Sequence, residues 1–211
     1  MKKLIIIGAR AFGREVYHLA KESKLYMNEY EIKGFLDSKS DALDLFEGYP
    51  DILSSVEDYK VQDDDVFICA LGDITYKKYY ADIILKKGGQ FISIIHPTAY
   101  VSPTSKIGVG CILSRYVTIS CDVTIGDFVT ISSHAGIGHD VEVGDWCHIG
   151  GFSNLSGGVK LEECVTLHPQ ANIVPRKILH NNAVVGVGSV VLKNVKAGTT
   201  VFGNPAKRID K

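Results

Sequence analysis

Val129–Trp146 reads VTISSHAGIGHDVEVGDW, and aliphatic residues recur in it at a fixed spacing of six, at Ile131, Ile137 and Val143. Side chains alternate between the two faces of a strand, so an aliphatic residue once per sextet predicts one short strand in each repeat. A six-residue unit cannot bury its own apolar face. Such units must therefore stack on one another as a solenoid.

The six-residue spacing continues well beyond this stretch. Sixteen successive positions are all Val, Ile or Leu: Val101, Ile107, Leu113, Ile119, Ile125, Ile131, Ile137, Val143, Ile149, Leu155, Leu161, Leu167, Ile173, Leu179, Val185 and Val191. In most sextets Gly or Ser comes directly after this aliphatic residue, which allows a sharp corner with unusual backbone angles. The pattern predicts a β-solenoid through the C-terminal half of the chain.

Composition excludes several function classes. The 211 residues carry 23 basic and 24 acidic side chains in an interspersed arrangement, so no basic stripe indicates nucleic-acid binding. The apolar run after the first two lysines, residues 4–7, is too short for a signal peptide or a membrane span. Five cysteines without a CxxC pair fit a reducing cytoplasm and provide no zinc motif. We expect a cytoplasmic protein with no membrane insertion.

Residues 1–97 have a different pattern, in which apolar strands alternate with amphipathic helices. Strands are expected at residues 4–7, 32–36, 66–71 and 91–95, and helices at residues 14–23 and 76–87. This order predicts a small parallel α/β sheet of the Rossmann-like type. Ligands of such sheets gather at the carboxyl ends of the strands, where Gly8, Asp37, Gly72 and Asp73 follow the apolar runs.

The first turn, GARAFG (Gly8–Gly13), resembles the dinucleotide-binding fingerprint, but Arg10 stands where the middle glycine belongs. A side chain at that position argues against binding of NAD. The following helix N-terminus still favours an anion, to which Arg10 could add a bidentate phosphate contact. The alternative is that Gly8 and Gly13 only permit a close turn.

The repeat region resembles the hexapeptide-repeat acyltransferases, and the C-terminal run GVGSVVLKNVKAGTTVFGNPAKRI (Gly186–Ile209) is similar to the acetyl-CoA-using branch. Together with the front domain and the segment Ile95-His96-Pro97, the whole chain resembles the sialic acid O-acetyltransferase and UDP-N-acetylbacillosamine N-acetyltransferase family. The resemblance implies a left-handed parallel β-helix with three sextets per coil. It also implies that residues 1–97 bind a nucleotide-sugar and that residues 98–211 bind acetyl-CoA.

The resemblance also implies roles for individual residues. The segment GHDVEVG matches the family's base motif, so His139 would be the general base and Asp140 its partner. The second family histidine, which hydrogen-bonds the thioester carbonyl, falls on His148. Correspondence with the family places acetyl-CoA against Gly157, Pro169 and Val187, and the nucleotide-sugar against Gly8, Arg10, Phe12, Asp37, Gly72 and Asp73. An imidazole titrates near neutral pH and can take a proton from an attacking amine or hydroxyl.

Other readings of the repeat region stay open. No histidine stacks on another at the spacing of one coil, which disfavours a metal site. Cys121, one coil before His139, could act as a nucleophile, although it more simply fills a corner. A catalytically silent scaffold that binds nucleotide-sugars is the alternative to an enzyme, and the sequence does not separate N- from O-acetylation.

His139 and His148 are nine residues apart, half of an eighteen-residue coil, so one chain cannot bring both to one thioester. They can meet between neighbouring chains. A three-sided prism packs naturally about a threefold axis, and the family resemblance also implies a homotrimer. The role of His134 stays undefined.

Overall fold

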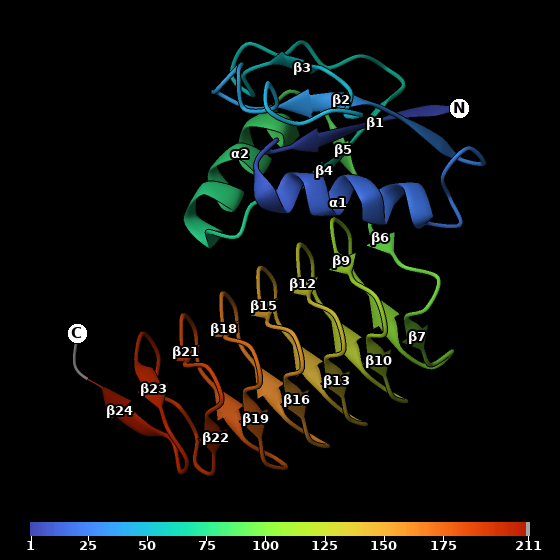
Figure 1. Cartoon of the computed structure of the whole chain (residues 1–211). Helices are drawn as coiled ribbons and strands as arrows, with labels where there is room; N and C mark the ends of the chain where they lie inside the picture. The colour runs from blue at the N-terminus through green and yellow to red at the C-terminus, as the bar shows by residue number, and fades with distance from the viewer. Residues whose placement is uncertain (210–211) are drawn as a thin grey trace. The chain divides into compact units, whose positions relative to one another are not determined.

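The computed structural model describes residues 1–209 and divides into an N-terminal unit, Met1–His96, and a C-terminal unit that begins at Pro97. The last two residues of the predicted C-terminal domain lie outside this range. The N-terminal unit contains β1 (Lys2–Ile7), α1 (Ala11–Glu22), β2 (Tyr30–Leu36), β3 (Ile52–Ser54), β4 (Asp65–Cys69), α2 (Ile74–Lys86), β5 (Gln90–Phe91) and β6 (Ile94–Ile95) (Figure 1). The predicted alternation of strands and helices is confirmed, but β3 is an additional short strand and the single strand expected at residues 91–95 is two short strands, β5 and β6.

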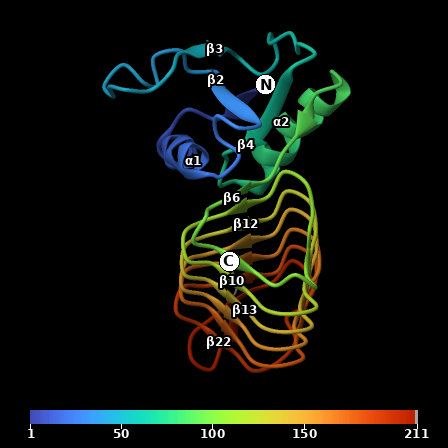
Figure 2. The ribbon, with the colours of Figure 1, turned by 90° about the vertical axis from the view of Figure 1, so that its right-hand side faces the viewer.

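The five strands β3-β2-β1-β4-β5 form a parallel sheet in that order. The chain moves in one direction across the sheet from β1 to β2 and in the other from β4 to β5. Because both crossovers are right-handed, α1 and α2 cover opposite faces (Figure 2). Burial on both faces explains the continuous apolar runs of β1 and β4, whose residues Leu4–Ile7 and Val66–Cys69 are almost fully buried.

Helix α1 begins at Ala11, three residues before the expected start, so the glycine turn is shorter than predicted. Gly8 has φ +97°, which only glycine adopts without strain. A Cβ on Gly13 would lie 1.9 Å from the carbonyl oxygen of Gly8. The two glycines therefore let the first turn of α1 pack directly against the end of β1.

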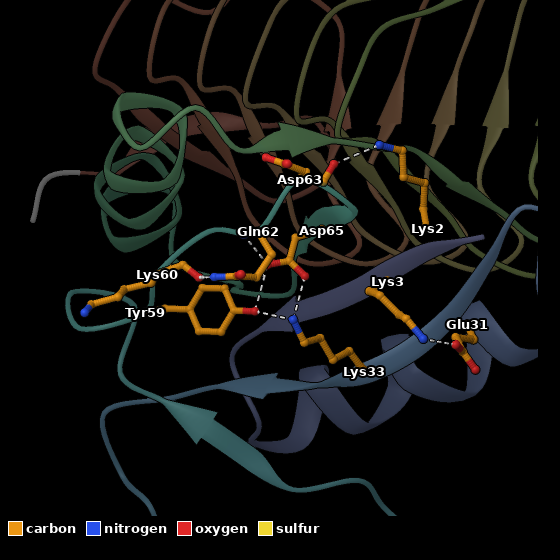
Figure 3. A network of polar contacts seen from close by, with 9 residues as sticks. All are labelled: Lys2, Lys3, Glu31, Lys33, Tyr59, Lys60, Gln62, Asp63 and Asp65. Atoms are coloured by element: carbon orange, nitrogen blue, oxygen red, sulfur yellow. Dashed lines mark hydrogen bonds and ion pairs between the residues drawn. The ribbon is translucent and has the colours of Figure 1, made fainter.

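A polar network closes the opposite, amino-terminal edge of the sheet (Figure 3). The Asp65 carboxylate is fully buried at the start of β4 and accepts hydrogen bonds from Lys33 Nζ, Tyr59 Oη and the Gln62 amide, each at 2.8 Å. Burial alone lowers the pKa of Lys33, but its hydrogen bonds to Asp65 and Tyr59 outweigh this and raise the pKa above its ordinary value. The network satisfies a charge that would otherwise destabilise the core.

The C-terminal unit is the predicted left-handed β-helix. Its strands are mostly two residues long, and partners lie eighteen residues apart, as for Thr118 with Tyr100 and Gly136 with Thr118. They form three parallel faces. The β7 face contains β7 (Tyr100–Val101), β10 (Thr118–Ile119), β13 (Gly136–Ile137), β16 (Asn154–Leu155), β19 (Asn172–Ile173) and β22 (Val190–Val191). The β8 face contains β8 (Lys106–Ile107), β11 (Thr124–Ile125), β14 (Glu142–Val143), β17 (Lys160–Leu161) and β20 (Ile178–Leu179).

The β9 face contains β9 (Ile112–Leu113), β12 (Thr130–Ile131), β15 (His148–Ile149), β18 (Thr166–Leu167), β21 (Val184–Val185) and β23 (Thr200–Phe202), which pairs antiparallel with β24 (Lys207–Ile209). In most strands the second residue is the repeat position found in the sequence, and it is buried. The aliphatic residues at the sixteen repeat positions thus form columns inside the prism, and buried area along them stabilises the stack.

Three corners separate the faces, and each is named here by one residue. The His139 corner (residues 120–123, 138–141 and 156–159) joins the β7 and β8 faces. The Asp127 corner (residues 108–111, 126–129 and 144–147, continuing at 162–165) joins the β8 and β9 faces. The His134 corner (residues 114–117, 132–135 and 150–153, continuing at 168–171 and 186–189) joins the β9 and β7 faces.

Side chains at the corners fix the register between coils. Asp127 Oδ1 accepts the Val109 amide at 2.8 Å, and Asp145 Oδ1 accepts the Asp127 amide at 2.7 Å. Each carboxylate thus accepts a hydrogen bond from a backbone amide in the preceding coil.

Within residues 1–209 no helix is long and apolar enough to cross a membrane.

Candidate active site

The predicted base and its partner are in contact at the His139 corner. His139 Nδ1 lies 2.6 Å from Asp140 Oδ2, and both side chains are largely exposed, at 64% and 66%. Asp140 has φ +57°, so the backbone turns sharply between the two residues. The short Asp side chain therefore reaches the imidazole, and with Nδ1 engaged, Nε2 is the ring nitrogen left for a reactant.

Gly157, one coil beyond His139, is where the imidazole rests. A Cβ on Gly157 would lie 2.5 Å from both Cε1 and Nε2 of His139, so the ring occupies the space that any other side chain would need. The Gly157 amide donates no hydrogen bond to any group within residues 1–209. Gly157 therefore leaves room for the imidazole, and its amide is a free donor in the neighbouring coil.

The other predicted acetyl-CoA residues lie elsewhere on the prism. His148 points outward from β15 on the β9 face, paired in register with Thr130 and Thr166. Pro169 and Val187 occupy equivalent positions, eighteen residues apart, on the exposed His134 corner. A single chain thus brings Gly157 to His139 but leaves His148, Pro169 and Val187 on a different side.

The N-terminal unit contains a cavity of about 540 Å³ at the carboxyl ends of β1, β2 and β4. All six predicted nucleotide-sugar residues line it: Gly8, Arg10, Phe12, Asp37, Gly72 and Asp73. The α1 amides of Ala11, Phe12 and Gly13 are without hydrogen-bond partners in the described part of the chain. This concentration of free donors at a helix N-terminus suits a phosphate.

Two carboxylates of the cavity are already engaged by backbone. Asp37 accepts the Ala9 amide on Oδ2 and the Lys39 amide on Oδ1, each at 3.0 Å, and Arg10 Nη2 lies 3.5 Å from Oδ1. Asp73 caps α2 by accepting the amides of Thr75 and Tyr76. Both residues therefore shape the cavity wall, and the exposed Arg10 guanidinium remains the cation that can reach an anion there.

The sequence interpretation missed two tyrosines of this cavity, Tyr76 and Tyr80. They are one helical turn apart on α2, directly after the Asp73 cap, and that spacing is the signal that could have revealed them. Burial raises the pKa of Tyr80, with Glu57 among the lesser causes, so its phenol is a neutral hydrogen-bonding group.

The five cysteines are all free thiols, of which Cys121 is exposed, and burial raises the pKa of Cys147 to about 12. The buried Cys147 thiol is therefore protonated and inert as a nucleophile.

Among residues 1–209 no group of three or more His, Cys, Asp or Glu side chains is arranged to hold a metal ion.

Comparison with known proteins finds relatives of both parts of the chain. Residues 3–95 match the PglD N-terminal domain family, and residues 122–157 match the bacterial transferase hexapeptide family of six repeats. GDP-perosamine N-acetyltransferase of Escherichia coli O157:H7 is 33% identical over 168 residues, which cover 69% of this chain and 68% of that protein. The chain belongs to the hexapeptide-repeat sugar acetyltransferases. The family, fold class and enzyme class predicted from the sequence are therefore confirmed.

Solved structures of the family resemble this one over its whole length. PerB from Caulobacter crescentus, in complex with CoA and GDP-perosamine, is 26% identical with a TM-score of 0.88, over 100% of this chain and 98% of that chain. The acetyltransferase domain of PglB from Neisseria gonorrhoeae FA1090, in complex with acetyl coenzyme A, is 25% identical with a TM-score of 0.88, over 99% of both chains. Both halves of this sugar acetyltransferase thus have counterparts in solved structures, of which one contains CoA and GDP-perosamine and the other acetyl coenzyme A.

Proposed function

We propose that this protein transfers the acetyl group of acetyl-CoA to an amino or hydroxyl group of a nucleotide-linked sugar, with His139 as the general base. The contact between His139 and Asp140 carries the proposal, because it orients an exposed imidazole whose ring fills the space left by the missing Cβ of Gly157. Relatives that bind CoA, acetyl-CoA and GDP-perosamine support the choice of ligands. An amine is the favoured acceptor, since the related E. coli enzyme is an N-acetyltransferase.

The reaction needs one base and one hydrogen-bond donor. The acceptor nitrogen or oxygen attacks the thioester carbonyl carbon while His139 Nε2 takes its proton. The oxyanion of the tetrahedral intermediate accepts a hydrogen bond from His148 or from a backbone amide, for which Gly157 is suitably placed. The C–S bond then breaks, the carbonyl re-forms, and the departing CoA thiolate takes up a proton.

The nucleotide-sugar would bind in the N-terminal cavity. Its diphosphate would accept hydrogen bonds from the free α1 amides and the Arg10 guanidinium, and Gly8 and Gly13 allow the close approach. Tyr76 and Tyr80 offer a partly apolar wall of the kind that a nucleobase or sugar ring packs against. All five cysteines are free, which supports assignment of the enzyme to the reducing cytoplasm.

The acetyl-CoA site would be shared between chains of a homotrimer. His139 and Gly157 would come from one chain, and His148, Pro169 and Val187 from its neighbour, because these two groups lie on different sides of one prism. Three chains about a threefold axis would make three equivalent sites.

The direct test is thiol release from acetyl-CoA over a panel of UDP-, GDP- and dTDP-linked amino and deoxy sugars, with mass spectrometry of the product. We expect one class of nucleotide-sugar to gain an acetyl group, and no release with the free nucleotide. Mixing inactive His139→Ala with inactive His148→Ala chains, under conditions that exchange protomers, should restore part of the activity. Absence of turnover on every sugar would support the silent scaffold instead.

A further inference from the structure

The side chain of Lys87, at the end of α2, binds the backbone of a turn that lies 28 to 31 residues earlier in the sequence. Its Nζ atom donates hydrogen bonds to the carbonyl oxygens of Val56 at 3.0 Å, Glu57 at 2.5 Å and Tyr59 at 3.0 Å. An ammonium group has three donors, so these contacts use all of them. Lys87 is therefore committed to this one turn.

The turn at residues 55–59 is a single turn of helix. The Tyr59 amide donates to the Ser55 carbonyl at 3.2 Å, and Ser55 Oγ accepts the Asp58 amide at 3.1 Å, as in a helix N-cap. The last carbonyl groups of a helical turn have no partner within it and carry a partial negative charge, which a cation compensates. Lys87 supplies that cation and caps the end of the turn.

The same turn contributes to the wall of the N-terminal cavity. Val56 lines the cavity and is 2% exposed, and Tyr76 and Tyr80 line it from α2. Tyr76, Tyr80 and Lys87 lie on one side of α2, because helical residues four, seven or eleven positions apart share a face. Burial raises the pKa of Tyr80 and the Glu57 carboxylate adds to the rise, so the turn lies close to this phenol as well. Lys87 thus ties Val56 to the helix that supplies the two tyrosines.

We propose that Lys87 is a positioning residue of the nucleotide-sugar site, which fixes Val56 and Tyr80 relative to each other by holding the 55–59 turn against α2. The inference rests on the proposed function, from which it takes the ligand of the cavity. Lys87 itself does not line the cavity, so it acts through these two residues. Without the ammonium group the turn carbonyls bind water, the two wall residues separate, and a nucleobase or sugar ring loses contact with them. Since the proposed base is His139, the loss falls on binding and not on the chemical step.

Steady-state kinetics tests this role with the member of the UDP-, GDP- and dTDP-linked panel that the wild-type protein acetylates. Lys87→Met keeps most of the aliphatic stem and removes the donors. It should raise KM for that nucleotide-sugar at least about fivefold, with kcat and KM for acetyl-CoA within about twofold of wild type. Lys87→Arg retains a cation with several donors and should recover most of the affinity. A wild-type KM in Lys87→Met would overturn the inference.

The matched control is the neighbouring lysine on the same end of α2. Lys86 pairs with Asp82, and the two side chains are 75% and 57% exposed. Lys86→Met removes one positive charge, as Lys87→Met does, but leaves the 55–59 turn capped. All three kinetic constants should stay at their wild-type values. A KM increase of equal size in Lys86→Met would assign the effect to net charge and overturn the inference.

A second control separates positioning from a general loss of stability. Tyr30 Oη donates to the Ala20 carbonyl at 2.8 Å in a buried position, and neither residue lines the cavity. Tyr30→Phe should therefore lower Tm without changing KM. If Tyr30→Phe raises KM as much as Lys87→Met does, at an equal loss of Tm, the effect is destabilisation of the domain and the positioning role is wrong.

Hydrogen exchange follows the turn without any substrate. The amides of Asp58 and Tyr59 should exchange at least about tenfold faster in Lys87→Met than in the wild type, and at the wild-type rate in Lys86→Met. Unchanged exchange in Lys87→Met would show that the lysine does not hold the turn and would overturn the inference, even in an active enzyme. A wild-type protein that binds and acetylates no sugar of the panel would overturn the proposed function. The positioning role would fall with it, whereas faster exchange in Lys87→Met would still show that Lys87 caps the turn.

Discussion

The α/β domain and the β-helix place functional residues by different means. In the β-helix, the eighteen-residue coil sets which residues are neighbours, and His139 and Gly157 are in contact because they are one coil apart. In the α/β domain, the cavity collects residues from Gly8 to Tyr80 at one edge of the sheet, with no fixed spacing between them. A substitution at a single residue one coil away can therefore disturb a site in the β-helix. A site in the α/β domain depends on the packing of the whole sheet.

The largest expected effect is on the β-helix side. His139→Ala should lower kcat at least about a hundredfold, about 2.7 kcal/mol in activation free energy, because the acceptor proton loses its base. Affinity for acetyl-CoA by calorimetry should change little, since the variant retains every other proposed contact. Near-normal turnover in a folded variant would contradict the assignment of the base.

The second prediction concerns the stability of the α/β domain, in which the buried Asp65 carboxylate binds side chains and backbone at the amino-terminal edge of the sheet. Asp65→Asn should lower the free energy of unfolding by about 2 kcal/mol in urea, because Lys33 and Tyr59 lose a charged acceptor. Glu31→Gln, which removes the half-exposed pair with Lys3, is the control and should cost less than about 1 kcal/mol. Equal losses in the two variants would refute a special role for the network.

The same network predicts a loss of stability at alkaline pH. The Lys33 hydrogen bonds to Asp65 and Tyr59 raise the pKa of Lys33 despite burial, and burial raises the pKa of Tyr59. Both groups hold their protons more tightly in the folded than in the unfolded chain. Their contribution is therefore complete below about pH 10 and is lost as pH rises through the folded pKa values. Wild-type stability should fall more steeply above that pH than the stability of Asp65→Asn.

A smaller effect on kcat tests whether Gly157, one coil away, lets the His139 ring keep its orientation. Gly157→Ala should lower kcat about tenfold, about 1.4 kcal/mol, because the new Cβ displaces the His139 ring from its contact with Asp140. The control is the same substitution in the His139→Ala background, where we expect no further loss. Equal losses in both backgrounds would show that Gly157 acts independently of the imidazole.

The smallest effect concerns Arg10 in the α/β cavity. Arg10→Ala should raise KM for the nucleotide-sugar severalfold, about 1 kcal/mol, with kcat nearly unchanged, because an exposed guanidinium contributes to binding more than to chemistry. Calorimetry should detect no binding of NAD to the wild-type protein. Tight NAD binding would contradict the interpretation of Arg10 in the glycine turn.

The sequence alone determined the β-helix to the level of individual contacts. Its period predicted which positions face the core and that His148 points outward. The coil length of three sextets, which the family resemblance implies, then predicted the neighbours of each residue one coil away. It also indicated the alternation of strands and helices in the α/β domain. At the ends of the expected strands it indicated four residues that line the cavity: Gly8, Asp37, Gly72 and Asp73. Family resemblance, and not the period, singled out His139 among the exposed histidines as the proposed base.

Only the tertiary structure decided the remaining features. The side-chain direction of His139 depends on the positive φ of Asp140 and the missing Cβ of Gly157, which the spacing does not reveal. Tyr76 and Tyr80 enter the cavity because α2 packs against β4, and Asp65 binds Lys33, which lies 32 residues earlier in the sequence. Such contacts join segments at arbitrary separations, so no local pattern encodes them. The β-helix could be read from the sequence because its tertiary contacts repeat with the sequence, and those of the α/β domain do not.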